Sequence, residues 1–207
     1  LEFRRVLFLS IVWNLAHSML VRGKNEVASI LFLGFKVNFP KDPRNKESEK
    51  YILSEQKNIH AYIKSLAEGV FLNPGPNGLN NENTQKYIDV CESFALVYPN
   101  DKMAPEYLFR AAEMSRAING LSKMMSLYDW IYQYFPSYKK APLSLFLKGF
   151  AMDSEFKKPE DAKKIYNQFL SEFPNDSLAN DVRFLLKNLG KSDEEILKEI
   201  EKNKNNF

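Results

Sequence analysis

Three prolines stand at nearly equal intervals between residues 99 and 174, and each lies in a tetrapeptide of the form aromatic, proline, polar, polar. The copies are Tyr98-Pro99-Asn100-Asp101, Phe135-Pro136-Ser137-Tyr138 and Phe173-Pro174-Asn175-Asp176. The prolines are 37 and 38 residues apart. A period between about 20 and 50 residues indicates stacked supersecondary units. The chain is therefore constrained to build one local structure three times.

The residues around the three prolines agree as well as the spacing does. Counted from each proline, an alanine follows at plus five (Ala104, Ala141, Ala179) and a phenylalanine at plus ten (Phe109, Phe146, Phe184). Position plus nine holds Leu108, Leu145 and Arg183, position plus thirteen holds Ala112, Gly149 and Lys187, and position minus eight holds Cys91, Tyr128 and Tyr166. A small residue at plus thirteen lets two helices approach closely, so we expect paired helices there.

The third copy shows the local structure most clearly. Pro159 fits the first position of a helix, where its missing N–H is not needed, and acidic residues follow where the helix dipole favours negative charge. Ala162, Ile165, Tyr166, Phe169 and Leu170 then form one apolar stripe. Pro174 lacks a donor and restrains Phe173, so the helix ends there and the polar residues begin the next one. We call each aromatic-proline-polar-polar tetrapeptide a proline corner.

This pattern resembles the tetratricopeptide repeat over about Thr84 to Gly190, with PEDAKKIYNQFLSEFPNDSLANDVRFLLKNLG as the most typical copy. It is similar to the longer-spaced form in bacterial envelope proteins of the outer-membrane assembly lipoprotein and Tol-Pal coordinating protein type. Tyr87 and Met124 depart from the pattern at the position of Ala162. The resemblance implies an all-α solenoid of stacked antiparallel hairpins, with about three repeats. Ser192-Asp193-Glu194-Glu195 is a capping box that predicts a C-terminal capping helix running to about Lys202.

The chain before the repeats divides into two parts. The first part is residues 1–46, which are apolar but poorly organised as far as Phe39. Two interpretations remain open: a signal-like segment, or non-native sequence resembling a translated library adapter (LEFRRVLFLS). We expect this segment to be ill-ordered and its removal to leave stability nearly unchanged. Residues 47–207 form the predicted repeat domain. It opens with a helix from Glu47 whose apolar face is Tyr51, Ile52, Ile59, Ile63, Leu66 and Val70, and which the sequence NPGPNG at 73–78 stops.

Charge and reactive side chains argue against several functions. Residues 1–50 hold 9 Lys or Arg and 5 Asp or Glu, whereas the rest holds 20 and 21, so the predicted domain lacks a basic footprint for nucleic acid. The two histidines, His17 and His60, are too far apart in sequence for a metal site, and we expect His60 to be structural or exposed. Cys91 occupies a repeat position that predicts a packing residue. We expect no catalytic residues, no metal and no cofactor, and hence no enzyme.

The resemblance implies a concave groove formed by the first helix of each hairpin, where a protein or peptide partner binds. Transferring the inward positions gives Met103, Glu106, Tyr107, Arg110, Met114, Leu143, Ser144, Leu147 and Phe150, followed by Asp181, Val182 and Leu185. Tyr107 instead filling the seam between repeats is the open alternative. The predicted function is a non-enzymatic interaction scaffold, periplasmic or outer-membrane associated by resemblance. The alternative is a membrane-anchored accessory factor for outer-membrane assembly or transport, which needs residues 1–21 to be native and inserted.

Overall fold

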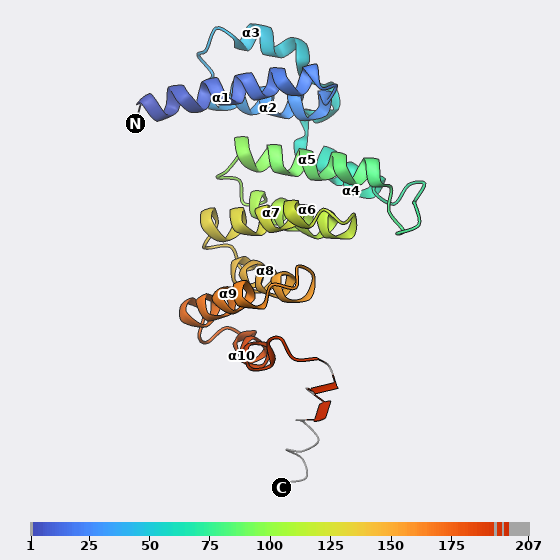
Figure 1. Cartoon of the computed structure of the whole chain (residues 1–207). Coiled ribbons are helices and arrows are strands. Elements are labelled where there is room, and N and C mark those ends of the chain that lie inside the picture. Colours follow the sequence, from blue (N-terminus) through green and yellow to red (C-terminus); the bar gives the residue numbers. More distant parts are fainter. Residues whose placement is uncertain (1, 193, 196, 199–207) are drawn as a thin grey trace. The chain divides into compact units, whose positions relative to one another are not determined.

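The computed structural model describes residues 2–192, 194–195 and 197–198, and this part of the chain consists of helices without a strand (Figure 1). The helices are α1 (Glu2–Val21), α2 (Asn25–Asn38), α3 (Asn45–Ser48), α4 (Ile59–Gly69), α5 (Asn81–Val97), α6 (Ala104–Ala117), α7 (Leu121–Tyr134), α8 (Ala141–Ser154), α9 (Pro159–Glu172) and α10 (Ala179–Asn188). Two 3-10 turns, η1 (Glu49–Tyr51) and η2 (Ser54–Lys57), follow α3. The all-α prediction is confirmed. The chain divides into two compact units, Leu1–Leu127 and Tyr128–Phe207, whose boundary falls within α7.

The three proline corners have the same hydrogen bonds, which explains why the sequence repeats them. In each corner, the last residue of the tetrapeptide donates its backbone N–H to the carbonyl of the aromatic residue. The bonds are Asp101 to Tyr98 at 3.0 Å, Tyr138 to Phe135 at 2.9 Å and Asp176 to Phe173 at 3.2 Å. The carbonyl of that last residue then accepts from the plus-five alanine, at 2.9 Å for Ala104, 2.8 Å for Ala141 and 3.0 Å for Ala179. Each of these alanines is buried and is the first residue of the next helix.

The other repeat positions are buried where a neighbouring helix covers them. Cys91, Tyr128 and Tyr166 are all buried in the second helices α5, α7 and α9. Phe109 of α6 is 9% exposed, whereas its counterpart Phe184 of α10 is 49% exposed. The exposed residues Arg183 and Lys187 also stand on α10 where the earlier copies have leucine and a small residue. α10 therefore presents to solvent a set of positions that are packed in the earlier copies.

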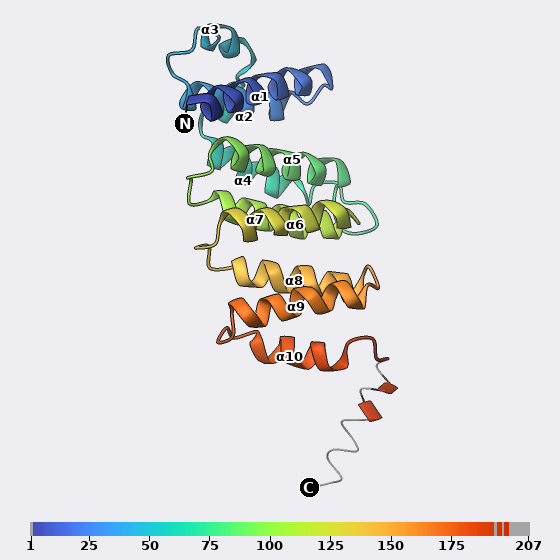
Figure 2. The ribbon, with the colours of Figure 1, turned by 60° about the vertical axis from the view of Figure 1, so that its left-hand side comes forward.

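Unit 2 packs around a close contact between α8 and α9, which lie side by side in both views (Figures 1 and 2). A methyl group at Gly149 would lie 2.8 Å from Cε1 of Tyr166 and 3.2 Å from Cγ2 of Ile165. The buried core around this contact consists of Leu145, Ala162, Ile165, Tyr166, Phe169, Ala179 and Val182. The expected close approach at the plus-thirteen position is thus present in α8.

Unit 1 contains the α1–α2 hairpin, and α2 packs directly on α5. A methyl group at Gly34 would lie 2.2 Å from Cβ of Val97, so only glycine permits this approach. The side-chain amide of Asn38 donates to the carbonyls of both Gly34 and Val97 at 2.8 Å. The hairpin is therefore an integral part of the unit, and residues 2–46 contribute helices rather than the expected ill-ordered segment.

Ion pairs reinforce the contact between α2 and α5. Glu26 lies 2.9 Å from Lys86, and Lys24 pairs with Asp89 at 2.5 Å. Burial alone would raise the pKa of Glu26, but its hydrogen bond with Lys86 and the charge of that lysine lower it overall. The carboxylate of Glu26 is therefore held in its charged form beside α5.

The helix expected from Glu47 is interrupted, and this part of the prediction was wrong. The backbone N–H of Leu53 donates to Oγ of Ser29 at 2.8 Å, and the side-chain amide of Gln56 donates to the carbonyl of Glu26 at 3.1 Å. These bonds draw the chain onto α2 and leave two 3-10 turns. Asn58 then begins α4 by accepting the N–H of Ala61 at 3.2 Å.

The predicted stop before residues 73–78 and the predicted capping box at Ser192 are both confirmed. α4 ends at Gly69, before the NPGPNG sequence, in which Asn73 and Gly78 have φ values of 51° and 78°. Further along the chain, the N–H of Ser192 donates to Oε2 of Glu195 at 2.8 Å, and the N–H of Glu195 donates to Oγ of Ser192 at 3.3 Å. This is the predicted capping box. The helix expected from there to Lys202 lies largely outside the described residues.

We predict that Gly149→Ala destabilises the protein by about 1 to 3 kcal/mol and that Gly149→Leu costs more, because the buried Tyr166 ring leaves no room. Urea unfolding of the two variants measures this. Gly69→Ala is the matched control, since the nearest atom to its added methyl group is 3.9 Å away. Equal stabilities for Gly149→Ala and Gly149→Leu would contradict the close contact.

We predict that Tyr166→Phe leaves the thermal midpoint unchanged or raises it. The Tyr166 hydroxyl is buried and has no hydrogen-bond partner in the described part of the chain, so its removal relieves a desolvation cost of about 1 kcal/mol or more. Tyr132→Phe is the control, because that hydroxyl bonds to Glu172 and Gln168 and its loss should lower stability slightly. A marked loss of stability in Tyr166→Phe would show that the hydroxyl is satisfied.

We predict that deletion of residues 1–45 lowers the urea midpoint of unit 1, opposite to the expectation from sequence. The deletion uncovers the face of α5 around Val97 and removes the partners of Lys86 and Asp89. Urea unfolding followed by circular dichroism tests this. An unchanged midpoint would mean that the α2 contact contributes no stability.

Candidate interaction surfaces

Five predicted groove residues lie in unit 1: four are on α6, and Met103 directly precedes its first residue. Glu106 and Arg110 share one face, where Nε of Arg110 donates to Oε1 of Glu106 at 3.0 Å. The Arg110 side chain is 55% exposed, and Met103 and Met114 are half-buried. The hydrogen bond to Glu106 raises the pKa of Arg110 against the opposing effect of burial. These four residues define the α6 surface, which is open to solvent chiefly at Arg110.

Tyr107 is positioned differently from its neighbours on α6. It is only 6% exposed, and its ring packs edge-on against Phe94 of α5, with centroids 5.2 Å apart. Its hydroxyl lies 2.8 Å from Nδ1 of His60 on α4, and Nε2 of the same histidine lies 3.5 Å from Asp101. Burial raises the pKa of Tyr107, and the nearby Cys91 and Asp101 raise it further. The tyrosine therefore fills the seam between α4, α5 and α6.

The remaining predicted residues lie in unit 2, on α8 and α10. Leu143, Leu147 and Phe150 are half-buried on α8, and the ring of Phe150 stacks on Phe146 at 6.2 Å. Ser144 is buried and donates its hydroxyl to the carbonyl of Lys140 at 3.0 Å. On α10, Asp181 is exposed, Leu185 is half-buried and Val182 is buried. Ser144 and Val182 are thus core residues, and the others are at least partly accessible.

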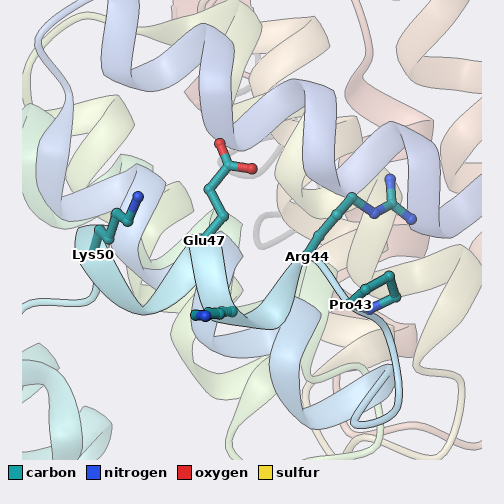
Figure 3. A pocket seen from close by; sticks show the side chains of 5 residues that line it. Pro43, Arg44, Glu47 and Lys50 are labelled. Atoms are coloured by element: carbon teal, nitrogen blue, oxygen red, sulfur yellow. The ribbon is translucent and has the colours of Figure 1, made fainter.

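A shallow hollow of about 410 Å³ lies beside α3 in unit 1 (Figure 3). Its lining consists of Pro43, Arg44, Lys46, Glu47 and Lys50. Arg44 is fixed by two 2.9 Å bonds to Asp42, and its guanidinium lies over the Trp13 ring at 5.3 Å. The hydrogen bond from Arg44 holds the pKa of Asp42 below its usual value. The sequence carried no signal for this hollow. Of the carboxylates near it, Asp42 pairs with Arg44, whereas Glu49 pairs with Lys36 outside the lining.

The described part of the chain offers few candidates for a nucleophile or a metal ligand. Burial raises the pKa of Cys91 to about 12, despite a hydrogen bond with Tyr87 and the charge of Arg110. The thiol therefore stays protonated at neutral pH and packs in the core. Among the described residues, no three His, Cys, Asp or Glu side chains gather in a way that could hold a metal ion. None of the described helices is long and apolar enough to cross a membrane.

Sequence reasoning missed two features of unit 1. It treated His60 as a structural or exposed residue and did not place it against Tyr107, because the two are 47 residues apart. It also did not single out Phe71 and Leu72, each of which is 62% exposed. The sequence did contain a signal for the exposed pair, because Phe71 and Leu72 stand directly before a loop rich in proline and glycine.

Comparisons with known proteins do not assign the chain to a family. No protein-family model matches it, and no curated protein matches it.

Proposed function

We propose that this protein is a non-enzymatic interaction scaffold that binds a protein or peptide partner on the exposed side of its first helices. The observation that carries the proposal is the α6 surface. There Arg110 is open to solvent and pairs with the half-buried Glu106, while Tyr107 packs against α4 and α5 and fixes the helix in place. Arginine and methionine are enriched in protein interfaces, and a rigid helix presents them without a large ordering cost.

The location and architecture of this scaffold form part of the same proposal. The repeated proline corners and the resemblance of about residues 84–190 to envelope tetratricopeptide repeat proteins support a stacked-hairpin solenoid in the bacterial cell envelope. Neighbouring helices in contact, such as α5 with α6 and α8 with α9, are compatible with that arrangement. Binding on the α6 surface needs only the residues of unit 1.

The variant that tests the proposal replaces both members of the ion pair, Glu106→Ala with Arg110→Ala, so that neither of the two is left without the other. We predict that the dissociation constant for the partner rises at least about tenfold, as expected for a central arginine contact, while the thermal midpoint stays close to wild type. The full chain serves as bait in the native cell. The recovered partner is then purified, and its affinity is measured by calorimetry.

The matched control removes an exposed ion pair on another helix, Asp161→Ala with Lys164→Ala, whose atoms are 2.9 Å apart. This control should bind like the wild type. Tyr107→Ala should instead lose about 3 to 5 kcal/mol of stability, as large aromatic truncations in a core do. If the Glu106 and Arg110 double variant binds the purified partner as tightly as the wild type, the α6 surface is not the binding site.

A further inference from the structure

The connection between α4 and α5 is much longer than the equivalent connections between first and second helices. It spans residues 70–80, whereas α6 joins α7 through residues 118–120 and α8 joins α9 through residues 155–158. Figure 1 shows it as a loop extending past the ends of both helices. Insertions into repeated units map to loops, and such loops are often where partners bind.

Hydrogen bonds across its base and within it give this loop a defined shape. The N–H of Asn80 donates to the carbonyl of Val70 at 2.7 Å, and the N–H of Gly75 donates to the carbonyl of Leu79 at 2.8 Å. The Asn80 side-chain amide donates to the carbonyl of Leu72 at 3.0 Å. Leu79 is 8% exposed and anchors the loop to the core. The loop is therefore pre-organised rather than a slack linker.

Phe71 and Leu72 are held outward by this ordered backbone. They are adjacent in sequence and each is 62% exposed, although Val70 before them is buried. Burying a side chain of this size is worth roughly 1.5 to 3 kcal/mol, and the loop forgoes that gain at two consecutive positions. An ordered loop that keeps two large apolar side chains in solvent presents a compact docking element.

The composition around the pair indicates what kind of surface it meets. Residues 70–81 contain no Lys, Arg, Asp or Glu, and their polar side chains are all asparagine. Attachment to an anionic membrane surface relies on lysine and arginine beside the apolar residues. The core of a protein interface is instead depleted of charge and rimmed by neutral hydrogen-bonding groups.

We propose that the α4–α5 loop is a docking element whose Phe71 and Leu72 side chains enter an apolar pocket of a protein partner. This site is separate from the α6 surface and does not depend on it. Because the loop is ordered before binding, the association avoids most of the entropy cost of fixing it.

The test places a photo-reactive benzoylphenylalanine at position 71 of the full chain, which preserves an aromatic ring there. Cross-linking in the native cell identifies the contacted protein, which is then purified for calorimetry. Phe71→Ser with Leu72→Ser should raise its dissociation constant at least about tenfold. The control, Ile11→Ser with Val37→Ser, removes apolar side chains that are 50% and 62% exposed elsewhere in unit 1 and should leave binding unchanged.

Three outcomes would overturn the proposal. The first is the absence of any protein cross-link, or a cross-link only to a second copy of this chain. The second is equal affinity of wild type and the folded loop variant for the purified partner, with folding checked by a melting curve. The third is sedimentation with vesicles of phosphatidylcholine and phosphatidylglycerol that depends on Phe71 and Leu72. Since the Glu106 and Arg110 variant leaves the loop intact, failure at one surface is distinguishable from failure at the other.

Discussion

The structure depends on the proline corner, a short segment in which one helix must end and the next must begin. A proline removes a backbone donor and restrains the aromatic residue before it, so the preceding helix cannot continue. The two hydrogen bonds that follow are the same in all three corners and deliver a buried alanine as the first residue of the next helix. With the direction of the chain fixed in this way, each amphipathic helix must bury its apolar face against a neighbour.

How closely those neighbours approach is decided by a few small residues. Gly149 lets α9 bring the Tyr166 ring against α8, and Gly34 lets Val97 of α5 reach the backbone of α2. In unit 2 this close packing buries the Tyr166 hydroxyl, which has no hydrogen-bond partner in the described part of the chain. At the Gly34 contact in unit 1, by contrast, the side-chain amide of Asn38 donates hydrogen bonds to the carbonyl of Gly34 on α2 and to that of Val97 on α5.

The candidate sites show why a position in a repeat does not by itself define a role. Tyr107 and Arg110 are three residues apart on one face of α6, yet the tyrosine is enclosed by α4 and α5 and the arginine is open to solvent. The repeat offset identified the helix and approximately the face. Which side chains on that face are covered depends on His60 and Phe94, which come from other helices and whose contacts no local pattern encodes.

The sequence by itself determined the all-helical class, the three corners, the stop before residues 73–78 and the capping box at Ser192, because each depends on backbone geometry and on hydrogen bonds between residues close in the chain. It also identified Cys91, Tyr128 and Tyr166 as packing residues from their shared register. Only the tertiary structure decided that residues 47–58 do not form one continuous helix. There the N–H of Leu53 and the side chain of Gln56 form hydrogen bonds with Ser29 and Glu26 on α2. The same holds for the docking of α2 on α5 and for the exposure of Phe71 and Leu72. These features depend on contacts between residues distant in sequence, which helical periodicity and local propensity do not encode.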